Sequence, residues 1–87
     1  MKHFAAPSFW DNYERLPVNT RKLADQYFNR LKLDIRHPSL HFKKIGRYRS
    51  VRVGLNHRAL ALEIPEGLLW FWIGTHNEYQ RMIKGEG

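Results

Sequence analysis

Residues 40–62, LHFKKIGRYRSVRVGLNHRALAL, decide the fold of this chain. Basic or polar residues alternate with apolar ones, as in Ser50-Val51-Arg52-Val53, and this period of two is typical of a strand with one face in water. The stretch contains no Asp or Glu. A sheet that presents cations in rows, with no acid to neutralise them, favours a partner that carries phosphate. The cations of the stretch are Lys43, Lys44, Arg47, Arg49, Arg52 and Arg58.

Length and composition limit the possible architectures. The chain has 87 residues, which predicts a single domain over 1–87, and 43% of them are hydrophobic, enough for a core. The net charge of +7 indicates a polyanionic partner; the alternative is a charge that serves only solubility. The absence of cysteine excludes disulfides, a thiol nucleophile and a zinc–thiolate site. Without a targeting signal or a membrane-spanning apolar run, the expected location is the cytoplasm.

Two helices are predicted before this stretch. Ser8 is the expected N-cap of the first, with Asp11 in the capping-box position. That helix ends at Pro17, which is expected to open the second helix, where a missing N–H costs nothing. The apolar residues of the second helix recur at helical spacing: Ala24, Tyr27, Phe28 and Leu31.

Beyond Pro38 the apolar period changes from 3.6 to 2. The pattern predicts strands over 40–45, 48–53, 57–64 and 68–75, then a helix over 76–83 and a tail over 84–87. The last two strands are apolar on both faces, which is typical of central strands. Residues 1–6 fit either a short edge strand or a disordered lead. The predicted fold class is therefore α+β: an N-terminal two-helix hairpin packed on a four-stranded antiparallel sheet, with a short C-terminal helix on its other face.

The order of these elements, with these residues, resembles the RelE/ParE superfamily of bacterial type II toxins. The resemblance covers nearly the whole chain and is strongest in HPSLHFKKIGRYRSVRVGLNHRALAL (37–62) and LLWFWIGTHNEYQRMI (68–83). Its motifs are the lysine pair before a turn, S-V-R-V-G, N-H-R-A, and W-I-G-T-H-x-E-Y at the end of the last strand. Each motif alone is weak, and together in this order they are specific.

The resemblance implies a toxin neutralised by a small antitoxin encoded beside it. Most characterised members similar to this chain are endoribonucleases that cleave mRNA, commonly in the ribosomal A site, and need no cofactor. A minority branch, the ParE proteins, inhibits DNA gyrase instead, so the same scaffold carries two activities. An inactive, purely nucleic-acid-binding relative is the third possibility.

Two arginines are the candidate phosphate contacts. Arg58 begins the third predicted strand, where RelE-like nucleases have an arginine on the scissile phosphate. The alternative is a cation on a solvated face, or one paired with Glu63 or Glu78. Arg52 has the parity opposite to Val51 and Val53 and is expected to face the open side, as a phosphate contact or as a structural residue.

Proton transfer is assigned to the last strand and helix. RNA cleavage without metal needs a base for the 2′-hydroxyl, charge neutralisation at phosphorus and a proton for the departing 5′-oxygen. His76 lies where several family nucleases have a basic residue, and histidine exchanges protons near neutral pH. The alternative is a histidine that only caps or packs. Tyr79 is expected to stack on a base or donate to the leaving group, or else to seal the helix to the core.

The other basic residues are expected to hold RNA backbone without reading its sequence. Lys43 and Lys44 point to opposite faces, so only one can face the site, and a lysine-protected edge strand is the alternative role. Arg47 and Arg49 join them as predicted RNA-binding residues. Trp70 and Trp72 share a parity and are predicted core residues.

The chain also departs from the most active nucleases, which carry more lysines and arginines near the last strand, where this chain has Thr75, His76 and Asn77. His37 and His41 flank Pro38, so they cannot form a helical metal pair, and no metal site is predicted. The expected partners are a cognate antitoxin, mRNA and the ribosome, with DNA gyrase as the alternative target and no membrane.

Overall fold

The computed structural model describes residues 1–85. Of the tail expected over 84–87, residues 86 and 87 lie outside the described part. The elements are β1 (Lys2–Ala5), α1 (Pro7–Glu14), α2 (Val18–Leu33), the 3-10 helix η1 (Pro38–Leu40), β2 (Lys43–Ile45), β3 (Tyr48–Val53), β4 (His57–Ile64), β5 (Gly67–Thr75) and α3 (His76–Ile83). The boundaries of β3, β4 and α3 coincide with those predicted from the sequence.

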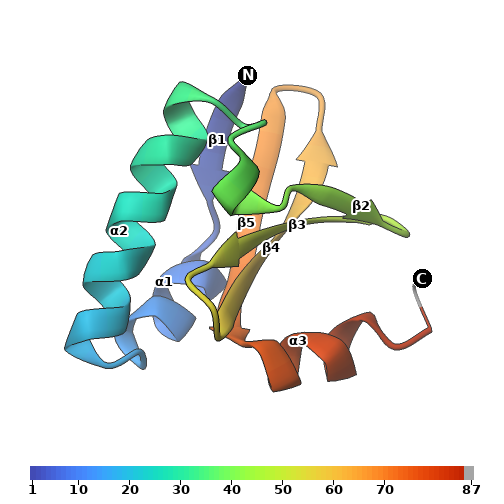
Figure 1. Ribbon diagram of the computed structural model, residues 1–87. Coiled ribbons are helices and arrows are strands. Elements are labelled where there is room, and N and C mark those ends of the chain that lie inside the picture. The colour runs from blue at the N-terminus through green and yellow to red at the C-terminus, as the bar shows by residue number, and fades with distance from the viewer. Residues whose placement is uncertain (86–87) are drawn as a thin grey trace.

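The strands form one mixed sheet in the order β1-β5-β4-β3-β2 (Figure 1). The expected four-stranded antiparallel sheet is wrong, because residues 2–5 form a fifth strand that pairs in parallel with β5. Gly67 allows this pairing: its φ is +150°, and a Cβ there would collide with the carbonyl oxygen of Lys2. The prediction that the last two predicted strands are central is confirmed, since β4 and β5 both have neighbours on each side.

The expected helical hairpin packed on the sheet is also wrong. The eight-residue α1 packs mainly on β5, whereas the sixteen-residue α2 packs on β3 and η1. The two helices differ in length and direction (Figure 1), and polar contacts connect them: the Tyr13 hydroxyl donates to Asp25 Oδ1 over 2.8 Å. This bond raises the pKa of Tyr13 above its ordinary value.

The start of α1 differs from the prediction because residues 2–5 form a strand. Because β1 leads directly into the helix, α1 begins at Pro7 with Ala6 as its N-cap, and no side chain caps it. Ser8 instead donates its hydroxyl to the carbonyl oxygen of Phe71 over 2.7 Å. This bond ties α1 to the irregular part of β5.

A β-bulge in the β4–β5 pairing separates the two tryptophans of β5. Trp70 lies opposite Ala61, and Trp72 lies opposite Leu60, so Phe71 is the extra residue. Trp70 is buried in the core that α1 and α2 cover, as predicted, whereas the shift takes Trp72 to the other face, on which α3 lies. A parity count along the sequence cannot detect such a shift.

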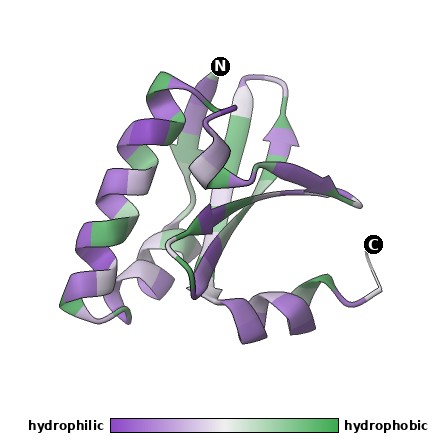
Figure 2. Cartoon of the chain, in the orientation of Figure 1, coloured by the Kyte–Doolittle hydropathy of each residue, from purple (hydrophilic) through white to green (hydrophobic). Residues whose placement is uncertain are grey.

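The two faces of the sheet therefore differ in character. The face toward α1 and α2 is an apolar core, and the face toward α3 contains polar and basic residues, with β2 largely hydrophilic in Figure 2. Buried core residues include Leu31, Val51, Val53, Ala59, Ala61, Trp70 and Ile73. None of the helices in residues 1–85 has the length and hydrophobicity of a membrane span.

The edge strand β1 is attached to the core by a titratable residue, His3, whose Nδ1 accepts a hydrogen bond from Trp70 Nε1 at 3.0 Å. Burial lowers the pKa of His3 from its ordinary 6.5, and the positive charges of the N-terminus and Lys32 lower it further. Since the unfolded chain takes up this proton at higher pH than the folded chain, the stabilisation is present above pH 6.5 and is lost as the pH falls through the folded pKa.

We therefore expect the free energy of unfolding in urea to decrease between about pH 7.5 and about pH 5, and to decrease less in His3→Gln. Glutamine does not titrate and keeps an acceptor for Trp70. Burial also lowers the pKa of His57, against the opposing effect of Glu78, and it does so in both proteins. The difference in unfolding free energy between wild type and variant therefore isolates the contribution of His3. Equal pH dependence in both proteins would contradict the assignment.

Candidate functional site

The face of the sheet toward α3 contains a buried arginine that has no acidic partner in the described part of the chain. Arg58 on β4 is only 4% exposed. Its Nε donates to Ser50 Oγ over 2.8 Å, and its Nη2 donates to the carbonyl oxygen of His41 over 3.1 Å. Burial lowers the pKa of Arg58, while Tyr79 opposes this effect and Arg52 adds to it. A buried cation held only by neutral groups is costly, which points to a role other than stability.

A second arginine lies directly opposite the first. Arg52 on β3 is the register partner of Arg58, so both side chains leave the same face of the sheet. Like charges at directly opposed positions destabilise a sheet. Neither arginine forms an ion pair within residues 1–85. An anion with several oxygen atoms would satisfy both guanidinium groups, because each has N–H groups in a rigid fork.

The helix α3 covers Arg58 through one aromatic side chain. The ring centroid of Tyr79 lies 4.9 Å from Arg58 Cζ, and Tyr79 is 2% exposed. Its hydroxyl is buried and has no hydrogen-bond partner in the described part of the chain. The Lys43 ammonium lies 6.0 Å from the same ring, and the ring of His76 lies 5.6 Å away. Three predicted site residues, Arg58, Lys43 and His76, therefore lie around the ring of Tyr79.

The start of α3 is fixed by a capping box. The Thr75 hydroxyl accepts from the backbone N–H of Glu78, and the Glu78 carboxylate accepts from the backbone N–H and the hydroxyl of Thr75. These bonds lower the pKa of Glu78. Gly74, before the cap, lies opposite Arg58, and a Cβ there would meet the Trp72 ring and the Glu78 carboxylate. Glycine therefore allows α3 to begin this close to the sheet.

An open depression of about 470 Å³ lies beside Arg52. Arg52 and His76 both line it, so the structure brings a phosphate-binding candidate and a proton-transfer candidate to one concave surface. Arg52 and His76 are each half-buried, whereas Arg58 is covered. The remaining lining residues are Leu55, Asn56, Thr75 and Asn77.

The other predicted RNA-binding residues are divided between the faces. Of the two neighbouring lysines, Lys43 lies on the face that Tyr79 covers, so it is the one that can face the site. Lys44, the register partner of Arg49, points to the other face. Arg49 forms an ion pair with Glu63 at 2.5 Å, so its charge is neutralised locally. Arg47, at the turn between β2 and β3, lies with its guanidinium 5.3 Å from the ring of Tyr48.

Sequence reasoning missed two residues of this site, Ser50 and His41. Ser50 is fully buried beneath Arg58, and its parity with Arg52 was the available signal. His41 has φ +44°, the one positive φ at a non-glycine residue in 1–85. Its ring Nε2 lies 3.4 Å from Arg52 Nη1, and its carbonyl binds Arg58. No sequence pattern indicates this strained backbone geometry.

The fold itself has a known counterpart. A chain of the RelB–RelE antitoxin–toxin complex from Methanococcus jannaschii superposes on it. The TM-score is 0.66 at 17% sequence identity, over 91% of this chain and 96% of that chain. At this identity the likeness shows a shared fold alone. No protein-family model and no curated protein matches the chain.

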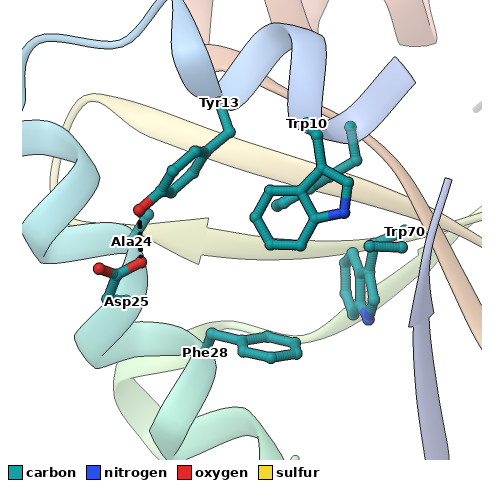
Figure 3. A pocket seen from close by; sticks show the side chains of 8 residues that line it. Trp10, Tyr13, Ala24, Asp25, Phe28 and Trp70 are labelled. Carbon is teal, nitrogen blue, oxygen red and sulfur yellow. Dashed lines mark hydrogen bonds between the residues drawn. The ribbon is translucent and has the colours of Figure 1, made fainter. Parts of the chain in front are cut away.

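A second concave surface lies on the opposite side of the sheet, where α1, α2, β1 and β5 meet (Figure 3). It has a volume of about 50 Å³, well below the roughly 300 Å³ of small-molecule sites. Trp10 and Phe28 are 50% and 39% exposed at this pocket, and Trp70 lines it from the sheet. Its single charged residue, Asp25, accepts the hydrogen bond from Tyr13 drawn in Figure 3. The pocket has room for one apolar side chain of a partner.

Proposed function

We propose that this protein is the toxin of a toxin–antitoxin pair and cleaves mRNA as a metal-independent endoribonuclease, most readily on the ribosome. The observation that carries the proposal is the buried Arg58 directly opposite Arg52, without an ion pair for either within residues 1–85. Such a pair is an anion site, and the net charge of +7 favours a polyanion. The fold shared with a chain of the RelB–RelE complex supports the toxin assignment.

In the proposed reaction the scissile phosphate binds first to Arg52, the more accessible arginine. Arg58 then stabilises the charge that grows on the non-bridging oxygens, once Tyr79 moves aside. The covered position of Arg58 suits this role, since a guanidinium in a dry environment acts more strongly on developing charge. Lys43 neutralises neighbouring phosphates, and the ring of Tyr79, uncovered by this movement, stacks on an unpaired base. His76 supplies a proton to the leaving oxygen.

The proposed partner is an antitoxin with an acidic, amphipathic segment. Its acidic groups would neutralise the arginine face, and an apolar side chain would enter the pocket between Trp10 and Phe28. The rings of Trp10 and Phe28 both lie on the face of the sheet that α1 and α2 cover, opposite to the face of the arginines. The segment would thus have to pass around the edge of the sheet.

A non-catalytic inhibitor of DNA gyrase is the second candidate function. The observation that favours it is the burial of both Arg58 and Tyr79, at 4% and 2% exposure. If α3 stays in place, neither group reaches a phosphate, and the basic surface acts only by binding. The two candidates differ in their products, which makes them separable.

The test is induction of the protein in a bacterial host, with mapping of transcript 5′ ends. We expect new ends within translated regions, and about 100-fold fewer in Arg52→Ala, as for loss of one group that stabilises transition-state charge. Arg15→Ala is the matched control, because Arg15 is an exposed arginine at the end of α1, outside the proposed site.

Growth arrest without new 5′ ends would reject the nuclease. In that event inhibition of DNA supercoiling by purified gyrase is the decisive measurement for the second candidate. If induction causes no growth arrest, no new 5′ ends and no inhibition of supercoiling, both proposed toxin activities are rejected.

A further inference from the structure

The loop residue His41 contacts both arginines of the proposed site. Its carbonyl oxygen accepts from Arg58 Nη2 at 3.1 Å, and its ring Nε2 lies 3.4 Å from Arg52 Nη1. Both contacts depend on the left-handed backbone conformation of His41, with φ +44°. This conformation is strained for a non-glycine residue, and such strain is concentrated at functional sites. The side chain itself is exposed.

The contact with Arg52 turns Nε2 of the imidazole toward the guanidinium. A guanidinium group has N–H donors and no acceptor, so His41 Nε2 can take part in this contact only through its lone pair. In the proposed reaction this basic nitrogen faces the arginine that meets the phosphate. Such a lone pair is what a general base requires.

The other histidines differ from His41 in their surroundings. His3 Nδ1 is occupied by Trp70, and His37 Nδ1 accepts from the backbone N–H of Ser39 at 3.2 Å. His57 is half-buried at the start of β4. His76 lines the depression that Arg52 also lines. Arg52 thus has one histidine at its guanidinium and another within the depression beside it.

We propose, resting on the proposed function, that His41 is the general base of RNA cleavage. Nε2 exchanges its contact with Arg52 for the substrate and takes the proton of the 2′-hydroxyl. The 2′-oxygen bonds to phosphorus, the bond from phosphorus to O5′ breaks, and protonated His76 gives its proton to O5′. The products are a 2′,3′-cyclic phosphate and a 5′-hydroxyl end. Arg52, released from His41, binds the phosphate that both histidines then flank.

The experiment compares His41→Asn with His37→Asn in single-turnover cleavage of mRNA on purified ribosomes and of free transcript. Asparagine tolerates the left-handed conformation at 41 and retains a capping acceptor at 37, so both variants are expected to fold. We expect His41→Asn to cleave about 100-fold more slowly, the usual contribution of a general base, and His37→Asn to match the wild type. Affinity for a 2′-O-methyl RNA of the same sequence, which cannot be cleaved, is expected to be unchanged in both.

A third variant distinguishes proton transfer from a structural role. His41→Gly keeps the carbonyl that binds Arg58 and removes only the ring, so added imidazole is expected to restore part of its cleavage rate. Full activity of His41→Asn, or a loss of RNA affinity as large as the loss of rate with no rescue by imidazole, would overturn the assignment. If the wild type itself cleaves neither substrate, it is the proposed function that fails, and the role of His41 falls with it.

Discussion

Replacing Arg58 with methionine and Ser50 with alanine together is expected to give a protein that is more stable than the wild type and inactive. The double variant removes a buried cation together with the hydroxyl that it holds, and methionine fills a similar volume. Exchanging buried charge for apolar groups of matched shape commonly stabilises a protein, here by about 1–2 kcal/mol. If the proposed function is correct, growth arrest and RNA cleavage are expected to be abolished, because Arg58 is gone.

The single variants show where this gain originates. Arg58→Met alone leaves the Ser50 hydroxyl buried without its partner, so its stability is expected to lie within about 1 kcal/mol of the wild type. Ser50→Ala alone removes an acceptor from a buried guanidinium and is expected to be the least stable of the three variants. Urea unfolding measures all of them. A double variant less stable than the wild type would show that Arg58 serves the fold rather than a ligand.

Tyr79→Ala is expected to lower the free energy of unfolding by about 3 kcal/mol, the usual cost of truncating a fully buried aromatic residue. Tyr79 is the one buried residue of α3, so its removal detaches the helix from the sheet as well as leaving a cavity. Limited digestion with trypsin is expected to cut at Arg81 faster in this variant, since a detached helix is a better substrate. The rest of the chain keeps its core.

Tyr79→Phe is the matched comparison. The tyrosine hydroxyl is buried and has no hydrogen-bond partner among residues 1–85, so phenylalanine is expected to stabilise the protein by about 1 kcal/mol while keeping the ring over Arg58. Trypsin resistance at Arg81 is expected to match or exceed that of the wild type. If Tyr79→Phe is instead destabilised, the hydroxyl has a partner in solution, and the covering of Arg58 by α3 needs a different explanation.

Local sequence patterns predict much of the fold, and the main error of that prediction concerns a long-range strand pairing. The period of two across Tyr48–Val53 and His57–Ile64 predicted β3 and β4 at their observed boundaries. The four residues of β1 carry too short a pattern to decide their state. Their pairing with β5 depends on Gly67, far along the chain, which accepts the close approach of Lys2. No window of local sequence contains both partners.

The candidate site shows the same division. The parity of β3 predicted that Arg52 leaves the face opposite to Val51, and it does. Burial of Arg58 could not be predicted, because it results from the packing of Tyr79 across two elements. The position of His41 depends on a single backbone angle in a loop, and hydrophobic periodicity carries no information about such an angle.

The parallel pairing of β1 with β5 also determines when the protein can fold during its own synthesis. Ala5 pairs with Trp70, so β1 has no partner in the sheet until the distant β5 has also been translated. β5, which lies between β1 and β4, is translated after the other four strands, and contacts between such distant segments form slowly. A nascent chain therefore lacks the sheet on which the arginine pair is displayed. If the protein acts on translation as proposed, that surface cannot form before β5 has left the ribosome.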